Sequence, residues 1–174
     1  MTLRQGEGRA LSRLEKLLFR LESQVAVLRE VTRETASRTG VIFELGLGSG
    51  RTYDFLRTHL AGREIFVFDR YAECPAEFMP PERHLVLGDI ERTLPTMAAR
   101  YAGQVVLAHS DVGSFDRDVN SWMAGVVSRE LGPALAPDAL VVADLPLLVP
   151  GTIPLPLPTG AREGRYFLYR KTGA

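Results

Sequence analysis

Five short apolar runs follow one another along most of the chain, and they constrain its fold more than any other feature of the sequence. None of them shows the alternation of apolar and polar residues that a half-exposed strand requires. Strands of this kind are buried on both faces, as in a parallel sheet that helices cover on each side. The five predicted strands cover residues 41–45, 65–68, 84–87, 105–108 and 140–143.

The segments between these runs can supply the covering helices. Residues 52–60, 90–99 and 118–135 are expected to be helical, the second of them in spite of Pro95, and Pro137 is expected to stop the third. A chain that alternates strands with helices forms an open, mostly parallel α/β sheet with helices on both faces. Its crossover connections are right-handed.

The C-terminal part departs from this alternation. Residues 145–159 contain five prolines and should form an extended surface segment, and residues 165–170 are expected to return as a final antiparallel strand. The aromatic residues near the end of the chain are expected to pack within that strand. Two residues of the helix expected over 118–135 are expected to lie in the core. These residues are Tyr166, Phe167 and Tyr169 in the strand, and Trp122 and Met123 in the helix.

An amphipathic helix is expected before the first strand. Its apolar residues follow spacings of three and four, which places them on one stripe of a helix. They are Leu11, Leu14, Leu18, Leu21, Val25 and Leu28. The pattern is too short for a coiled coil, so the stripe packs either within its own domain or against a neighbouring subunit. Because an exposed apolar stripe is a liability for a monomer, we expect a homo-oligomer.

Composition narrows the possible partners and location. The chain has 174 residues, of which 45% are hydrophobic, and its 21 basic residues are balanced by 21 acidic ones, which argues against nucleic acid as a partner. The apolar runs reach about five residues, far fewer than the roughly 20 that span a bilayer, so no membrane contact is predicted. No secretory signal pattern is visible and Cys74 is the single cysteine, so we expect a cytoplasmic protein. His59 and His84 lack the spacing of metal ligands.

The most informative stretch is residues 41–52, VIFELGLGSGRT, in which the first predicted strand runs through three glycines into a helix. Glycines at such a turn let the backbone approach a ligand closely. A dinucleotide fingerprint would require glycine where Arg51 stands, and no phosphate-binding loop ending in Gly-Lys-Ser/Thr is present. What remains is an acidic residue, one spacer and Gly-x-Gly-x-Gly, formed by Glu44, Gly46, Gly48 and Gly50.

This pattern resembles the first motif of the class I S-adenosylmethionine-dependent methyltransferases, a family with a Rossmann-like fold. The resemblance implies that the glycine loop, residues 46–50, passes under the methionine part of S-adenosyl-L-methionine and that Glu44 helps to hold the methionine ammonium. The cofactor-binding residues implied at this turn are Glu44, Gly46, Leu47, Gly48, Ser49, Gly50 and Thr52. A merely conformational role for the turn is the alternative.

Two further strand ends support the resemblance. Asp69 ends the second run, where a carboxylate can accept hydrogen bonds from both ribose hydroxyls, as the ribose-binding acid of the family does. Gly88 and Asp89 end the third run, where the acid of the family accepts from the adenine amino group. Ile90, which follows, is implied to lie against the adenine ring. Asp89 could instead serve only as the cap of the following helix.

The residues after the fourth run border the position that the family gives to the methyl acceptor. Asp111 is the candidate to orient or deprotonate the acceptor, and His109 is the candidate to line the cofactor or assist as a base. A loop or capping role is the alternative for Asp111. The Asn/Asp-Pro-Pro-aromatic motif of nucleic-acid amino methyltransferases is missing here. Asp144 is followed by Leu145, whereas metal-dependent catechol-like O-methyltransferases carry an Asp-Asn pair, so no metal site is predicted.

The resemblance implies methyl transfer from S-adenosyl-L-methionine to a small-molecule acceptor through an O, N or S nucleophile. One alternative is a module that binds S-adenosylmethionine or S-adenosylhomocysteine without catalysis, and another is a nucleotide-dependent oxidoreductase, which Arg51 disfavours. The predicted organisation is a single methyltransferase-like domain. It consists of an N-terminal helical extension (1–39), a cofactor-binding core (40–145) and a proline-rich segment with the final strand (146–174).

Overall fold

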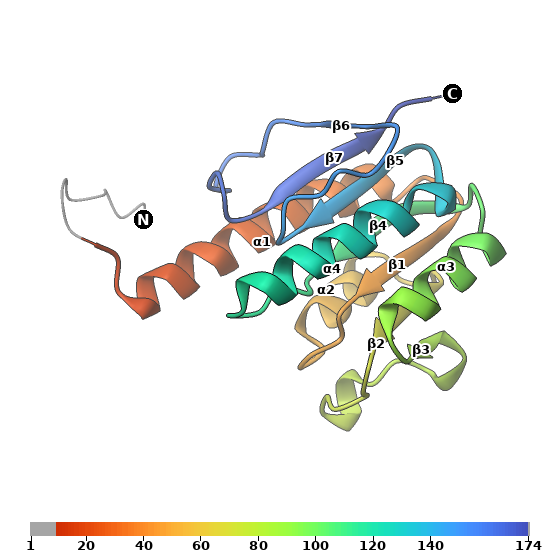
Figure 1. Ribbon diagram of the computed structural model, residues 1–174, viewed down its shortest axis with the longest axis horizontal. Helices are drawn as coiled ribbons and strands as arrows, with labels where there is room; N and C mark the ends of the chain where they lie inside the picture. Colours follow the sequence, from red (N-terminus) through yellow and green to blue (C-terminus); the bar gives the residue numbers. More distant parts are fainter. Residues whose placement is uncertain (1–9, 174) are drawn as a thin grey trace.

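A seven-stranded sheet in the order β3-β2-β1-β4-β5-β7-β6 forms the centre of the molecule (Figure 1). The structure is a computed structural model that describes residues 10–173, so residues 1–9 of the expected N-terminal extension and Ala174 lie outside it. The first five strands are parallel, β7 runs antiparallel to β5, and β6 runs antiparallel to β7. The strands are β1 (Val41–Leu45), β2 (Ile65–Asp69), β3 (Leu85–Leu87), β4 (Val105–Ser110), β5 (Leu135–Ala143), β6 (Thr152–Pro154) and β7 (Phe167–Lys171).

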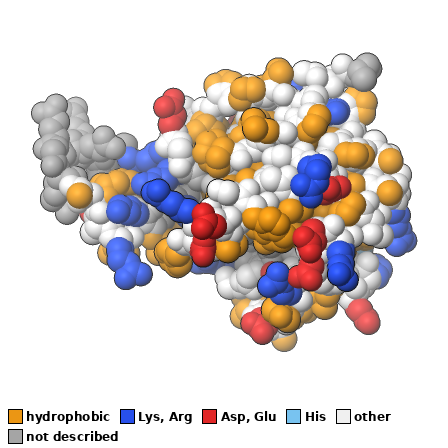
Figure 2. Space-filling view, viewed as in Figure 1, with side chains coloured by type: hydrophobic (Ala, Val, Ile, Leu, Met, Phe, Trp, Pro, Cys, Tyr) orange, Lys and Arg blue, Asp and Glu red, His pale blue; other side chains and the backbone are white. Residues whose placement is uncertain are grey.

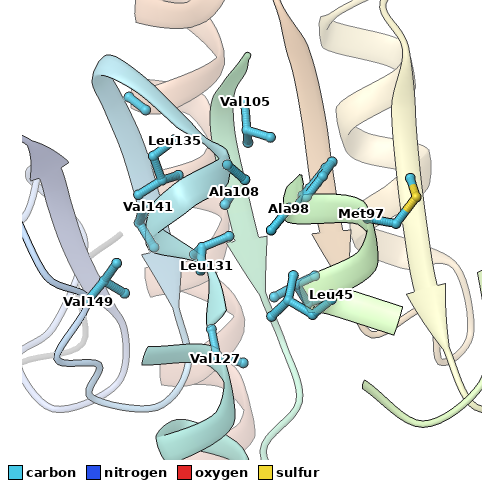
Figure 3. Close-up of a cluster of buried hydrophobic side chains, with 14 of the residues drawn as sticks. Leu45, Met97, Ala98, Val105, Ala108, Val127, Leu131, Leu135, Val141 and Val149 are labelled. Carbon is cyan, nitrogen blue, oxygen red and sulfur yellow. The ribbon is translucent and has the colours of Figure 1, made fainter. Parts of the chain in front are cut away.

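Helices cover both faces of this sheet, which confirms the predicted α/β Rossmann-like fold. Alternate residues of β1 point to opposite faces, as the period of a strand requires: Ile42 packs on one face, Phe43 and Leu45 on the other. The face of Ile42 is covered by α1 (Arg13–Thr35) and α2 (Arg51–His59). The opposite face, part of which Figure 3 shows, is covered by α3 (Ile90–Arg100) and α4 (Arg117–Glu130).

The prediction of a helix over residues 118–135 is wrong at its C-terminal end. α4 ends at Glu130, a 3-10 helix (Gly132–Ala134) follows, and β5 begins at Leu135. Pro133 lacks the backbone N–H that would continue the α-helix, so the chain leaves it earlier than expected. Pro137 lies within β5 instead of stopping a helix, in an irregular stretch where Asp138 adopts a φ of 57° and the register with β4 shifts. A smaller correction concerns His84, which belongs to a 3-10 helix before β3.

α1 is longer than predicted and buries a different stripe. Ser12 caps it, donating its backbone N–H to Glu15 while its hydroxyl accepts from the backbone N–H of Glu15. The buried apolar residues are Phe19, Val27, Leu28 and Val31. Of the predicted stripe, Leu28 is buried but Leu14 is 75% exposed, because the first turns of α1 project from the body (Figure 1). Figure 2 shows hydrophobic and basic side chains together on this projecting part.

The C-terminal segment follows the prediction in its extended course, but Leu147 and Val149 are buried in the core and do not lie on the surface. The proline-rich stretch is mostly extended and contains β6, which forms the outer edge of the sheet. Pro154 has no backbone N–H to donate, and among the described residues the outer side of this edge strand has no neighbouring strand that would accept one. The predicted final strand is β7; Tyr166, just before it, and Tyr169, within it, are buried. Within residues 10–173, no helix combines the length and the apolar character needed to cross a membrane.

Candidate active site

The glycine loop turns sharply between β1 and α2 because its three glycines all have positive φ angles, 98° at Gly46, 49° at Gly48 and 80° at Gly50. A Cβ atom added at Gly46 would come within 2.5 Å of the carbonyl oxygen of Asp111, so this position must be glycine for β1 and the end of β4 to approach each other. A Cβ atom at Gly48 would meet nothing within 4 Å. Gly48 therefore leaves open space at the carboxyl edge of the sheet.

A cavity of about 460 Å³ lies beside this loop. The ends of β1, β2 and β3 contribute Gly46, Asp69 and Gly88 to its wall, so the structure brings together three motifs that are far apart in the sequence. Its remaining lining is mainly apolar and includes Phe68, Ile90, Val112, Val119, Trp122 and Met123. A carboxylate at one side and apolar walls elsewhere suit a nucleoside, which needs acceptors for its ribose hydroxyls and a flat apolar slot for its base.

Asp69 holds the glycine loop against β2. Its Oδ2 accepts hydrogen bonds from the backbone N–H groups of Leu47 (2.8 Å) and Gly48 (3.1 Å). Its Oδ1 accepts from the N–H groups of Arg70 (2.6 Å) and Tyr71 (3.3 Å). The carboxylate is thus fixed at the cavity wall, and its expected bonds to a ribose remain a prediction.

Asp89 occupies the N-cap position of α3, but its side chain makes no capping hydrogen bond. Instead, Arg70 donates from Nε to its Oδ1 at 3.0 Å, and both side chains are about half exposed. Gly88 and Ile90, its neighbours in the chain, line the cavity, whereas Asp89 is not part of the lining. Its expected contact with an adenine amino group remains a prediction.

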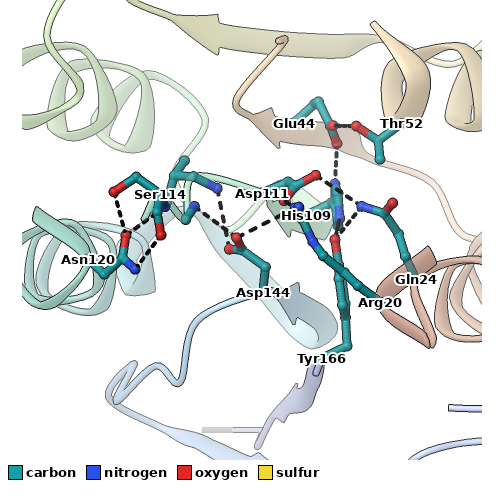
Figure 4. Close-up of polar contacts among 12 residues, drawn as sticks. Arg20, Gln24, Glu44, Thr52, His109, Asp111, Ser114, Asn120, Asp144 and Tyr166 are labelled. Carbon is teal, nitrogen blue, oxygen red and sulfur yellow. Dashed lines mark hydrogen bonds and ion pairs between the residues drawn. The ribbon is translucent and has the colours of Figure 1, made fainter. Parts of the chain in front are cut away.

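Glu44 and His109 form a sealed pair beneath the loop (Figure 4). Both side chains are fully buried, and His109 Nδ1 donates to Glu44 Oε2 at 2.7 Å. The other oxygen of Glu44 accepts from the hydroxyl of Thr52, and His109 Nε2 lies 3.2 Å from the hydroxyl of Tyr166. Burial alone would lower the pKa of His109, but the carboxylates around it, above all Glu44, raise that pKa above its ordinary value. Burial also raises the pKa of Tyr166, so its hydroxyl stays protonated.

Asp111 is bound by two residues of α1. Arg20 donates to its Oδ1, and Gln24 donates from Nε2 both to its Oδ2, at 3.0 Å, and to the hydroxyl of Tyr166. Gln24 and Tyr166 thus connect Asp111 to His109 (Figure 4). A carboxylate that accepts one bond at each oxygen still has lone pairs for a further donor.

Asp144 lies next to Asp111 at the end of β5. Its carboxylate accepts from the backbone N–H groups of Val112 (3.3 Å) and Gly113 (2.8 Å), and Arg20 lies 4.0 Å away. Burial, together with the nearby charge of Asp111, raises the pKa of Asp144 to about 6. This group therefore changes protonation near neutral pH at the border of the site.

Several residues of this site escape prediction from sequence. The expectation of a core position is wrong for Trp122, which is 43% exposed and lines the cavity. Met123 also lines the cavity, but it is partly buried and packs against the core as expected. Their position in the early turns of the helix after β4, at the carboxyl edge of the sheet, is a signal that could have indicated the cavity. Arg20 and Gln24 gave no such signal, because they contact Asp111 across 91 and 87 positions of the chain.

Comparison with known proteins connects this geometry to a family. Residues 11–171 match the family described as S-adenosyl-L-methionine methyltransferase. A solved S-adenosyl-L-methionine methyl transferase from Silicibacter pomeroyi DSS-3 is 41% identical, with a TM-score of 0.88. The alignment covers 93% of this chain and 99% of that one. A search of the curated proteins found no match.

More distant structures share the fold. A methyltransferase from Geobacter sulfurreducens is 15% identical with a TM-score of 0.55, over 84% of this chain and 78% of that one. TrmN from Thermus thermophilus is 14% identical with a TM-score of 0.54, over 83% of this chain and 48% of that one. The match along nearly the whole chain shows that this protein belongs to the S-adenosyl-L-methionine methyltransferase family, with S-adenosyl-L-methionine as its cofactor.

Proposed function

We propose that this enzyme transfers the methyl group of S-adenosyl-L-methionine to a small-molecule acceptor, which meets the cofactor where β1 and β4 end. The observation that carries the proposal is the cavity beside the glycine loop, because its wall combines the ends of three strands. Ligands of open α/β sheets bind at this edge.

The residues along the cavity fit the parts of the cofactor in order. The methionine part would lie over the glycine loop, with Leu47 and Ser49 beside it, because Gly48 leaves open space there. Asp69 would accept from the ribose hydroxyls. The adenine would lie near the third strand end, bordered by Gly88, Asp89 and Ile90. Glu44 would support this site from beneath, since Thr52 and His109 occupy both of its oxygens.

Chemistry at the acceptor side depends on alignment. When bound, S-adenosyl-L-methionine supplies a methyl group on a positively charged sulfonium, which makes that methyl a good electrophile. The contribution left to the protein is to align the acceptor and exclude water. Asp111 would orient the acceptor nucleophile, because Arg20 and Gln24 hold its carboxylate in one position. His109 would act as a positioning residue, through Tyr166, since it has no exposed surface.

A small acceptor agrees with the charge of the chain. Equal numbers of acidic and basic residues provide no excess to neutralise a phosphate backbone. The test is transfer of a labelled methyl group to a panel of small phenols, amines and thiols, with RNA and DNA oligonucleotides in parallel. Product on a small acceptor is the expected result, and product on oligonucleotides alone would contradict the proposal.

A homo-oligomer is part of the same proposal. Leu14, Leu17 and Leu18 are exposed on the first turns of α1, where the helix projects from the body. A second copy that covered them would also lie near Arg20, which contacts Asp111. Burial of such side chains is the usual driving force of stable association.

A further inference from the structure

A network of buried hydrogen bonds connects the glycine loop to α1 and to the C-terminal segment (Figure 4). We call it the buried network, and its members are Thr52, Glu44, His109, Tyr166 and Gln24, all of which are buried. They come from α2, β1, β4, the residue before β7, and α1. Polar side chains in the interior are costly unless each has a partner, so such a network holds its members in one arrangement.

At one end, the buried network closes the base of the glycine loop. Glu44 precedes the loop and Thr52 follows it in the first turn of α2, and the hydroxyl of Thr52 donates to Oε1 of Glu44. This bond joins the two ends of residues 46–50. Asp69 binds two backbone N–H groups inside the loop, whereas the bond from Thr52 fixes the point at which the loop enters α2.

Towards the other end, Tyr166 holds the imidazole of His109. Nδ1 of His109 donates to Oε2 of Glu44 at 2.7 Å, and Nε2 lies 3.2 Å from the hydroxyl of Tyr166. The hydroxyl can donate to Nε2 when His109 is neutral and accept from it when His109 is protonated, so this contact exists in both states. The bond at one ring nitrogen sets the orientation of the ring and thereby the bond at the other. Tyr166 therefore fixes the direction in which His109 meets Glu44.

Gln24 holds Tyr166 in turn. Its Nε2 donates to the hydroxyl of Tyr166 and, at 3.0 Å, to Oδ2 of Asp111. Residues 10–173 give the hydroxyl of Tyr166 no hydrogen-bond partner other than Gln24 and His109. Loss of this hydroxyl would therefore leave Nε2 of His109 without a partner in the interior.

We propose that Tyr166 is a positioning residue for S-adenosyl-L-methionine, because its hydroxyl keeps the glycine loop in the conformation that binds the cofactor. The path from Tyr166 to the loop runs through His109 and Glu44 and ends at the bond from Thr52. This inference rests on the proposed position of the cofactor over the glycine loop. It extends that proposal to a residue of the C-terminal segment that is 1% exposed and does not line the cavity. A loop that is already fixed binds its ligand without the cost of being ordered.

Calorimetry with S-adenosylhomocysteine tests this path through two substitutions that preserve side-chain shape. Tyr166→Phe removes the hydroxyl at one end of the path, and Thr52→Val removes the hydroxyl at the other. Each substitution alone should weaken the affinity for S-adenosylhomocysteine about fivefold, as the loss of one hydrogen bond does. The double variant should also lose only about fivefold, because Tyr166 acts on the loop through the bond that Thr52 makes. A loss of about 25-fold, which independent sites would produce, would overturn the inference.

Two control variants distinguish this role from a general loss of stability. Thr52→Ser keeps the hydroxyl and should keep the affinity of the parent. Tyr169→Phe also removes the hydroxyl of a buried tyrosine, which accepts from the backbone N–H of Leu147 at 2.9 Å. It should lower the free energy of unfolding and leave the affinity for S-adenosylhomocysteine unchanged. Undiminished affinity in Tyr166→Phe, or equal weakening in Tyr166→Phe and Tyr169→Phe, would contradict the proposal.

Further variants make the outcome decisive. If Tyr166→Phe does not fold, Gln24→Met takes its place in the cycle with the same expectation, because it removes the donor to the same hydroxyl and has a similar shape. Gly48→Val tests the position of the cofactor on which the inference rests. Parental affinity in Gly48→Val would contradict that position. Loss of binding in Gly48→Val, together with independent effects in the cycle, would overturn the role of Tyr166 alone.

Discussion

Arg20 on α1 donates a hydrogen bond to Asp111 at the end of β4, although the two residues are 91 positions apart in the chain. The bond joins α1 to the loop that follows β4, where we propose that the methyl acceptor binds. Gln24 lies one turn further along α1 and binds the other oxygen of the same carboxylate. α1 therefore contacts the residue that follows β4 as well as covering one face of the sheet.

Loss of this bond should reduce both stability and activity. Arg20→Gln leaves a partly buried carboxylate without its charged partner, so we expect the free energy of unfolding to fall by about 1–3 kcal/mol. Methyl transfer should fall more than S-adenosylhomocysteine affinity, because Asp111 is proposed to orient the acceptor and not the cofactor. Urea unfolding and turnover measure the two effects. Arg33→Gln is the control, since Arg33 pairs with Glu30 on the exposed surface, and it should change stability by less than about 1 kcal/mol.

Gly48 offers a test of the glycine loop with a closely matched control. Gly48 and Gly62 both have positive φ, and an added Cβ meets nothing within 4 Å at either position. Gly48→Val and Gly62→Val should therefore carry a similar backbone penalty, of order 1–2 kcal/mol. Only Gly48→Val should abolish S-adenosylhomocysteine binding in calorimetry. Equal affinity of the two folded variants for S-adenosylhomocysteine would contradict a role of the glycine loop in cofactor binding.

The pKa of Asp144 predicts a pH dependence of stability. Its folded-state pKa of about 6 lies above the ordinary value of 3.8, so the folded protein holds this proton more tightly than the unfolded chain does. Stability from this group is therefore present below about pH 4 and is lost as the pH rises through 6. Asp144→Asn removes the titration. The stability of this variant relative to the parent should rise by about 2–3 kcal/mol between pH 4 and pH 8, and a pH-independent difference would contradict the assignment.

The projecting leucines of α1 predict the oligomeric state. Light scattering should find the parent larger than a monomer at micromolar concentration, and changing Leu14, Leu17 and Leu18 to Gln should yield a folded monomer. A variant of Leu28 is unsuitable here, because that side chain is buried within the same chain and its loss would unfold the protein. A monomeric parent would refute the proposal.

Local patterns explain why much of the fold was predictable. The buried strands and the glycine loop are determined by residues that are neighbours in the sequence. The carboxyl ends of parallel strands meet at one edge of a sheet, so the sequence alone predicts that Gly46, Asp69 and Gly88 lie close together. The end of α4 was missed because Pro133, and not Pro137, interrupts its hydrogen bonding.

The features that could not be predicted from the sequence depend on contacts between residues far apart in the chain. The leucine spacing of α1 correctly indicates a helix. Which face of the helix is buried depends on the packing of Val27 and Val31 against the sheet, and the spacing of the leucines carries no information about that packing. The same holds for the polar partners of Asp111, which come from a distant helix. The bonds of Glu44 to His109 and Thr52 were not foreseen either, because the positions of these partners depend on the complete fold. The expected role of Glu44 toward the methionine ammonium stays a prediction.

The central claim is that the cofactor lies along the strand ends with its ribose at Asp69, and one calorimetric cycle tests it most directly. S-adenosylhomocysteine and its analogue without the two ribose hydroxyls are titrated into the parent and into Asp69→Ala. Because Asp69 also binds the backbone of Leu47 and Gly48, disturbance of the loop alone would weaken both ligands equally. The account predicts a loss of about 1.5–3 kcal/mol for S-adenosylhomocysteine and almost none for the analogue. Equal losses for the two ligands, or no loss for either, would contradict it.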